Sequence, residues 1–208
     1  MQGIATFLSY SPNHSSRVRY FPNVDLIKAN LVGITLDKAE LTRAKLTEAN
    51  FSRASLIGTY LTKADLSHAN LNGANLIKAN LIGANLTAVD LSNACLAEAY
   101  LNETNLSGAN LSGVNLEGAS LYRANLSGAN LRGAYYNEKT YFDANFDPVS
   151  AGMQIRKIAS KHSNHQENSK PEKFQGVFRN SNYQEDSTLE MSNLNLADIE
   201  ALLEILGD

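Results

Sequence analysis

A large apolar residue recurs at every fifth position of this chain, from Leu26 to Phe146, without a gap. Of the 25 positions in this series, 21 hold leucine and the others hold phenylalanine or tyrosine. A period of five fits neither regular element, because helical leucines so spaced would spread around the whole helix and strand side chains alternate with period two. The chain must therefore turn once in every five residues.

Each five-residue unit gives every position a fixed role. A small residue, alanine in 18 of the 25 units, lies two positions before the large one, so both point to one side of an extended segment. We call these the small and large inner positions. The residue between them is the outward position, and it is asparagine or aspartate in 15 units. The last two residues form a corner, and all nine glycines between 24 and 148 fall at its second position. This favours a positive φ there, as at the third residue of a type II turn.

The repeat, with units such as the Ala-Asn-Leu-Ser-Gly of residues 109–113, resembles the pentapeptide-repeat family over residues 24–148. The closing run from Tyr136 to Pro148 is similar to the C-terminal signature of cyanobacterial members. The resemblance implies an all-β solenoid, a right-handed quadrilateral β-helix with four units in each square coil. The series would then make about six coils, each stabilised by its neighbours.

The repeat also sets the expected division of the chain. Apart from the β-helix over 24–148, we expect an N-terminal segment or cap (1–23), a short capping helix (149–159), a polar linker (160–173) and a tail (174–208). The tail has apolar residues on one helical stripe near 195–206, which predicts a short α-helical C-terminal extension. The stripe consists of Leu196, Ile199, Leu202, Leu203 and Leu206.

Nothing in the sequence indicates catalysis, a cofactor or a metal. Cys95 occupies an outward position without a histidine nearby in sequence, and we interpret it as a surface substitution. His162 and His165 lie in the polar linker without other ligand types. No apolar run approaches the roughly 18 residues of a membrane span. We expect a non-enzymatic protein in the cytoplasm, with thylakoid association or another compartment left open.

Two groups of residues are candidate partner-binding sites. Because each coil has 20 residues, Tyr60, Asn80 and Tyr100 should lie on one side of the solenoid, in a series that runs from Glu40 to Thr140. Tyrosine is enriched at interfaces, although a solvated ladder of mixed residues is the alternative. The apolar stripe of the tail is the second candidate, because it must dock either in a partner's groove or on an end of its own solenoid.

Two functions follow, in different classes. The first is a non-catalytic scaffold or regulator that binds another protein, with a second copy at a solenoid end as a further candidate partner. The second is a DNA mimic that acts on gyrase, as some members of the family do. A mimic needs a strongly negative surface, whereas residues 24–148 contain 12 acidic and 10 basic side chains. We therefore favour the scaffold, with neither nucleic acid nor membrane as a partner.

Overall fold

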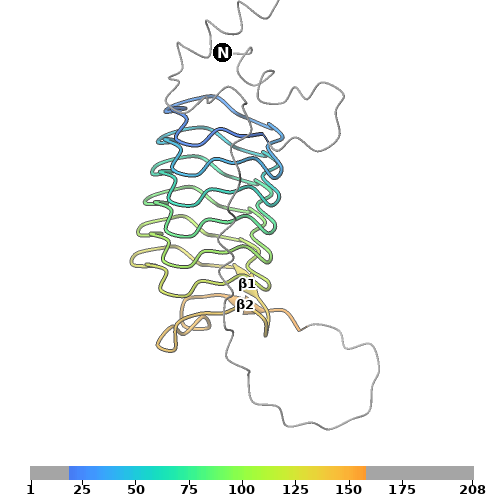
Figure 1. Ribbon diagram of the computed structural model, residues 1–208. Coiled ribbons are helices and arrows are strands. Elements are labelled where there is room, and N and C mark those ends of the chain that lie inside the picture. Colours follow the sequence, from blue (N-terminus) through green and yellow to red (C-terminus); the bar gives the residue numbers. More distant parts are fainter. Residues whose placement is uncertain (1–18, 158–208) are drawn as a thin grey trace, which may run out of the picture.

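The chain winds into a tower of stacked coils, seen in a computed structural model that describes residues 19–157 (Figure 1). From Tyr20 to Tyr135, parallel backbone bridges join outward residues that are 20 positions apart, as Asn30 to Asn50. Four series of bridges begin at Tyr20, Asp25, Asn30 and Thr35, so every coil has four sides. We call each vertical series of outward residues a column.

Backbone hydrogen bonds run mainly between coils. The N–H of Leu31 donates to the carbonyl of Asn50 (2.8 Å), and the N–H of Asn50 donates to the carbonyl of Ala29 (2.9 Å). Within each corner, a bond such as that from Ile34 N–H to the Leu31 carbonyl (3.2 Å) closes the turn. Because most bonds join neighbouring coils, no coil satisfies its backbone alone.

The second corner residue has a positive φ at every fifth position from Asn23 to Gly133. The glycines of this series have φ between +63° and +71°, and the other residues have φ between +53° and +59°. The corner predicted from the glycines is therefore confirmed. Fourteen of these positions hold a residue other than glycine, and none of the fourteen is β-branched. The left-handed backbone costs about 1–2 kcal/mol of folding free energy at each of these residues, and the stacking of coils must offset this cost.

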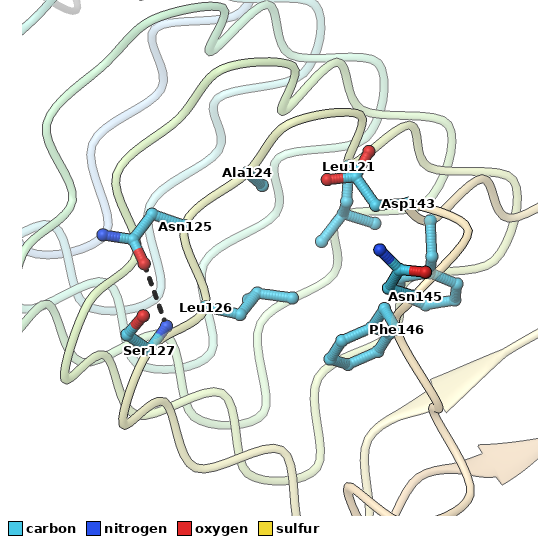
Figure 2. A pocket seen from close by; sticks show the side chains of 9 residues that line it. Leu121, Ala124, Asn125, Leu126, Ser127, Asp143, Asn145 and Phe146 are labelled. Atoms are coloured by element: carbon cyan, nitrogen blue, oxygen red, sulfur yellow. Dashed lines mark hydrogen bonds between the residues drawn. The ribbon is translucent and has the colours of Figure 1, made fainter.

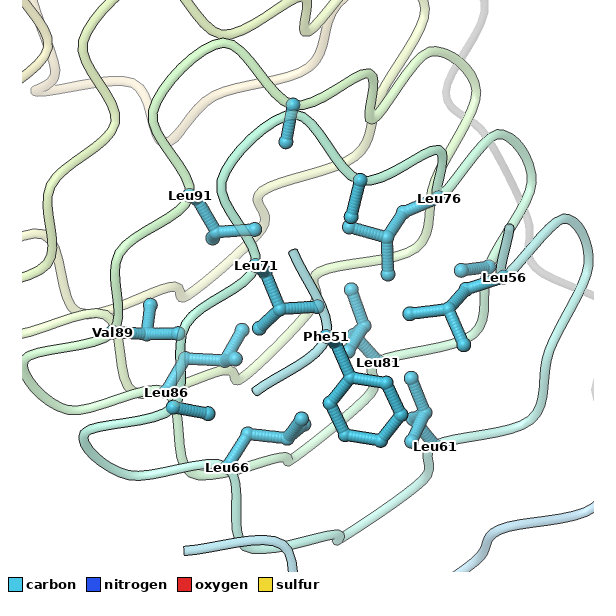
Figure 3. Close-up of a cluster of buried hydrophobic side chains, with 14 of the residues drawn as sticks. Phe51, Leu56, Leu61, Leu66, Leu71, Leu76, Leu81, Leu86, Val89 and Leu91 are labelled. Atoms are coloured by element: carbon cyan, nitrogen blue, oxygen red, sulfur yellow. The ribbon is translucent and has the colours of Figure 1, made fainter. Parts of the chain in front are cut away.

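The core consists of stacked leucines with alanines beside them. Every large inner residue from Leu26 to Leu121 is at most 2% exposed. Figure 3 shows the ring of Phe51 among the leucines of neighbouring coils. Thr59 takes a small inner position and is fully buried, and its hydroxyl donates to the carbonyl of Leu36 (2.8 Å). A polar group is thus tolerated in the core because it is hydrogen-bonded.

The first coil begins earlier than the sequence predicted. Tyr20 forms a bridge with Glu40 and lies at an outward position. Phe21 takes the large inner position and is 8% exposed, and Asn23 is the corner residue with positive φ. The repeat therefore starts at Tyr20 rather than at residue 24.

One extra residue interrupts the repeat near its other end. Ser120 pairs with Tyr141, 21 residues later, and not with Thr140. The extra residue lies in a three-residue corner, 137–139, which is closed by a hydrogen bond from the Thr140 N–H to the carbonyl of Asn137 (3.0 Å). The side chain of Asn137 is buried and accepts the N–H of Gly118 (3.1 Å). The prediction of an unbroken register up to residue 146 is therefore wrong.

The shift changes which side chains point inward. The hydroxyl of Thr140 donates to the carbonyl of Leu116 (2.8 Å), as expected for a small inner position, and Tyr141 is 53% exposed. Phe142, rather than Tyr141, packs with the aromatic residues Tyr136 and Phe146 at this end of the tower. Its ring lies 5.7 Å from that of Tyr136, edge to face, and 4.9 Å from that of Phe146 in a stacked pair.

Two short strands close this end. Strand β1 (Tyr135–Tyr136) pairs in parallel with β2 (Gln154–Ile155). Turns occupy 148–152, so the helix predicted over 149–159 is wrong for its described part, which ends at residue 157. Met153, just before β2, is buried, whereas both residues of β2 are exposed. The linker over 160–173 and the tail with its apolar stripe lie outside the described residues.

Candidate functional site

One side of the tower carries a tyrosine on every second coil. We call this series the tyrosine column, and in order its members are Tyr20, Glu40, Tyr60, Asn80, Tyr100, Ser120 and Tyr141. The four tyrosines are between 42% and 57% exposed. The structure therefore places the predicted Tyr60, Asn80 and Tyr100 together and adds a tyrosine at each end.

The two added tyrosines escaped the sequence reasoning for separate reasons. Tyr20 lay before the presumed start of the repeat. The five-residue period predicts Tyr141 at a large inner position, because the extra residue in the corner 137–139 leaves the aromatic series unbroken in sequence. A signal was present, since an unbroken register would place Lys139 at a small inner position, where an unpaired charge is costly.

The residues between the tyrosines are shorter and lie against the tower. The amide oxygen of Asn80 accepts the N–H of Ile82 (3.1 Å), and the hydroxyl of Ser120 donates to the side chain of Asn102 (2.5 Å). Both residues are partly buried. The column therefore presents protruding rings that alternate with short, hydrogen-bonded side chains.

The aromatic surface widens beside the last tyrosine. The ring of Tyr122, on the adjacent corner, lies 5.9 Å from that of Tyr141. The guanidinium of Arg123 lies 5.0 Å from the Tyr122 ring centroid and 3.9 Å from the carboxylate of Glu103. This end therefore combines two exposed aromatic rings with a cation, a composition that is frequent in interfaces.

The column that begins at Asn30 stabilises the fold and is not a candidate binding surface. The amide of Asn110 donates to the carboxylate of Asp90 (3.1 Å), and that of Asn130 donates to the side-chain oxygen of Asn110 (3.2 Å). The oxygen of Asn110 also accepts the N–H of Ser112 (3.3 Å). These bonds join side chains of neighbouring coils, so this column acts as a stabilising ladder.

A similar ladder surrounds Asp65 on another side of the tower. Partial burial acts to raise the pKa of this carboxyl, but hydrogen bonds from Ser67, Thr47 and Asn85 outweigh it. The pKa therefore lies below its usual value, and the carboxylate is held ionised by groups of its own and adjacent coils. A carboxyl with a lowered pKa is suited to accept hydrogen bonds that stabilise the fold, and it is not suited to donate a proton.

The remaining chemistry of the described residues is sparse. Cys95 is partly buried at an outward position. Across residues 19–157, no group of three or more His, Cys, Asp or Glu side chains is placed to hold a metal ion. No helix within that range is long and apolar enough to cross a membrane.

A cavity of about 390 Å³ lies at the C-terminal end of the tower (Figure 2). Its lining includes Leu121, Leu126, Phe142 and Phe146, and Leu126 is only partly buried. The N–H of Arg123 donates to the Asp143 carboxylate (3.0 Å) at this end, in place of a backbone acceptor. The cavity therefore lies where the last coil is incomplete, so that it covers the end of the core only in part.

The four-sided coil, the inward leucines and the positive-φ corners define a class of repeat protein. The sequence pattern of the family described as pentapeptide repeats (8 copies) matches residues 21–56, 54–93, 64–101 and 99–135. The chain belongs to the pentapeptide-repeat family, whose members fold as right-handed quadrilateral β-helices.

Solved structures of this family resemble the chain, whereas no curated protein matches it. A pentapeptide-repeat protein from the thylakoid lumen of Arabidopsis thaliana is 34% identical, over 48% of this chain and 69% of that chain, with a TM-score of 0.46. HetL, which is involved in heterocyst differentiation regulation in the cyanobacterium Nostoc, is 32% identical, over 59% of this chain and 62% of that chain (TM-score 0.26). A trypsin-treated variant of QnrB1, a plasmid-mediated fluoroquinolone resistance protein, is 20% identical, over 66% and 84% (TM-score 0.49). The predicted resemblance to cyanobacterial members is confirmed.

Proposed function

We propose that this chain is a non-catalytic scaffold that binds another protein through the tyrosine column. The observation that carries the proposal is the presence of four half-exposed tyrosines on one side of a single tower. Proteins of the family are generally structural or interaction proteins rather than enzymes. We also propose, as predicted from the sequence, that the protein acts in the cytoplasm without a cofactor.

Rigidity makes such a surface effective. The N–H groups of Tyr60 and Tyr100 donate to the carbonyls of Ala39 and Ala79 in the preceding coil, both at 2.9 Å. Their backbone is thus fixed before any partner arrives. A tyrosine also loses little conformational entropy on binding, since it has only two side-chain torsions. Binding energy is therefore not consumed in ordering the site.

The alternative is DNA mimicry directed at gyrase, and the charge distribution argues against it. Among residues 19–157, four ion pairs join basic and acidic side chains of adjacent coils at 3.3–3.9 Å: Lys28–Glu48, Lys45–Asp25, Lys78–Glu98 and Arg123–Glu103. Such pairing neutralises acidic groups that a mimic would need unpaired. We expect no inhibition of gyrase supercoiling at low micromolar concentration, and strong inhibition there would make mimicry the better proposal.

Affinity capture with matched variants tests the scaffold. The bait is the full chain, the full chain with Tyr60→Ser and Tyr100→Ser, and a control with Asn85→Ser on another side of the tower. We expect the native chain and the control to retain the same partner in stoichiometric amount, and the tyrosine variant to lose it.

A fourth bait, the chain lacking 160–208, addresses the second candidate site. The apolar stripe of Leu196, Ile199, Leu202, Leu203 and Leu206 stays a prediction, as does a homodimer through a solenoid end. If deletion of the tail abolishes capture while the tyrosine variant retains the partner, the tail is the binding site and the proposal for the tyrosine column is wrong. Retention of no stoichiometric partner by any bait would contradict the scaffold itself.

A further inference from the structure

The tyrosine column has a fixed repeat length. Adjacent coils are separated by the strand spacing of roughly 4.8 Å, so tyrosines on alternate coils recur about every 9.6 Å. Because Ser120 pairs with Tyr141, the last tyrosine keeps this spacing despite the extra residue. From the first tyrosine to the last there are therefore six coil-to-coil steps, or about 29 Å.

This repeat length matches one peptide conformation closely. A polyproline II helix has three residues per turn and rises about 3.1 Å per residue, so that every third residue returns to the same side after about 9.3 Å. Over the three intervals between Tyr20 and Tyr141 the two periods differ by about 1 Å in total, which side-chain torsions can absorb. We propose that the tyrosine column binds a proline-rich segment of a partner protein in the polyproline II conformation, with a proline beside each tyrosine.

The alternation of protruding and short side chains along the tyrosine column suits such a ligand. The short, partly buried Asn80 and Ser120 leave gaps between protruding rings. Pyrrolidine rings packed in these gaps would contact aromatic faces, as proline-rich ligands do in aromatic-lined grooves. Polyproline II carbonyls have no internal hydrogen bonds, so the tyrosine hydroxyls have acceptors within the same ligand.

Charge sets a further requirement on the ligand. Glu40 is the one charged member of the column and lies between Tyr20 and Tyr60. One oxygen of its carboxylate accepts the N–H of Thr42 (2.9 Å), which holds the group against the corner and leaves acceptor capacity for a cation. We therefore expect an arginine or lysine in the ligand near the N-terminal end of the column.

This inference rests on the proposed function and names the class of partner for the same site. The test uses the full chain and two fluorescein-labelled peptides of 12 residues and identical composition. One peptide has proline at every third position and an arginine at one end. The other has the same residues in an order that places no two prolines three apart. Fluorescence anisotropy should show the phased peptide binding at least tenfold more tightly.

Three variants of the chain probe the geometry. Exchanging Asn80→Tyr and Tyr100→Asn keeps the composition but moves one ring by a coil, and it should weaken binding of the phased peptide at least tenfold. Asn85→Ser, on another side, should leave it unchanged. Glu40→Gln should weaken binding severalfold at low salt, but it should not weaken binding of a phased peptide that carries glutamine in place of arginine. Thermal melting of each variant by circular dichroism separates loss of binding from loss of fold.

Three outcomes would overturn the inference. They are equal affinity for the two peptides, unchanged binding by the variant with the moved ring, and binding of a cello-oligosaccharide in place of the peptide, which would make the column a carbohydrate surface. If the phased peptide does not bind but Tyr60 and Tyr100 are needed to capture a protein, the polyproline II inference is wrong and the proposed function stands. If capture is also independent of those tyrosines, both are wrong.

Discussion

The positive φ values at the corners predict that an alanine-to-glycine substitution there stabilises the protein, although glycine usually destabilises a folded chain. Ala88 has φ +53° at the second corner position, where Gly108 follows on the next coil with φ +66°. Replacing Ala88 with glycine removes about 1–2 kcal/mol of backbone strain. It also makes the unfolded chain more flexible, which costs about 0.4–1 kcal/mol. We therefore expect Ala88→Gly to stabilise the protein by about 0.5–1 kcal/mol.

The reverse change and a neighbouring control complete the test. At Gly108 an added Cβ meets no atom within 4 Å, so Gly108→Ala should cost a similar amount through strain alone. Ala84 lies at a small inner position and is 1% exposed, and Ala84→Gly should destabilise by about 1–2 kcal/mol because a buried methyl group is lost as well.

Equilibrium urea unfolding followed by circular dichroism gives the three midpoints. Midpoints suit this comparison because solenoids can unfold in segments rather than in one step. We expect the midpoint of Ala88→Gly above that of the native chain and those of Gly108→Ala and Ala84→Gly below it. Destabilisation by Ala88→Gly equal to that by Ala84→Gly would refute the reasoning from φ.

Three other predictions follow from the core and the ladders. Leu86→Ala should cost about 2–5 kcal/mol in urea unfolding, and Leu86→Asp should leave no folded protein by circular dichroism. Thr59→Val should lower thermal stability by only about 1 kcal/mol, because the Leu36 carbonyl keeps the N–H of Ala39 as a donor. The lowered pKa of Asp65 stabilises the folded state above the unfolded pKa near 4, and this contribution is lost as the pH falls through the folded pKa. The urea midpoint should therefore fall between pH 5 and pH 2, and less steeply in Asp65→Asn; equal slopes would contradict this role for Asp65.

The regular coils could be predicted because every five-residue unit repeats the same pattern of inner, outward and corner positions. A leucine and an alanine two positions apart must face one side, and glycines in one phase mark the corner that needs a positive φ. The period of five does not reveal the break near residue 137, because Tyr141 is aromatic and lies five residues after Tyr136, although Phe142 is the residue that points inward. The decisive signal was polar: Lys139 cannot occupy the core, whereas Thr140 can hydrogen-bond there as Thr59 does.

The candidate site was predicted in part for the same reason. Tyr60, Asn80 and Tyr100 lie in regular coils, so counting by 20 places them together correctly. Tyr20 lies before the first counted unit and Tyr141 follows the extra residue, so counting by 20 does not place them, whereas the backbone pairing does. The period of the aromatic surface, on which the inference about its ligand rests, could not be read from two tyrosines alone.

The direction of the backbone hydrogen bonds also determines how the tower would respond to force. Nearly all bonds between coils lie along the tower axis, so tension applied at the two ends of the repeat would load one coil junction at a time. Each junction would open as a zipper rather than resist as a clamp. Every opened coil would release 20 residues, or roughly 70 Å of extended chain. A tether pulled this way would lengthen in even steps at low force, while the same tower would remain stiff towards a load pressed on its tyrosine-bearing side.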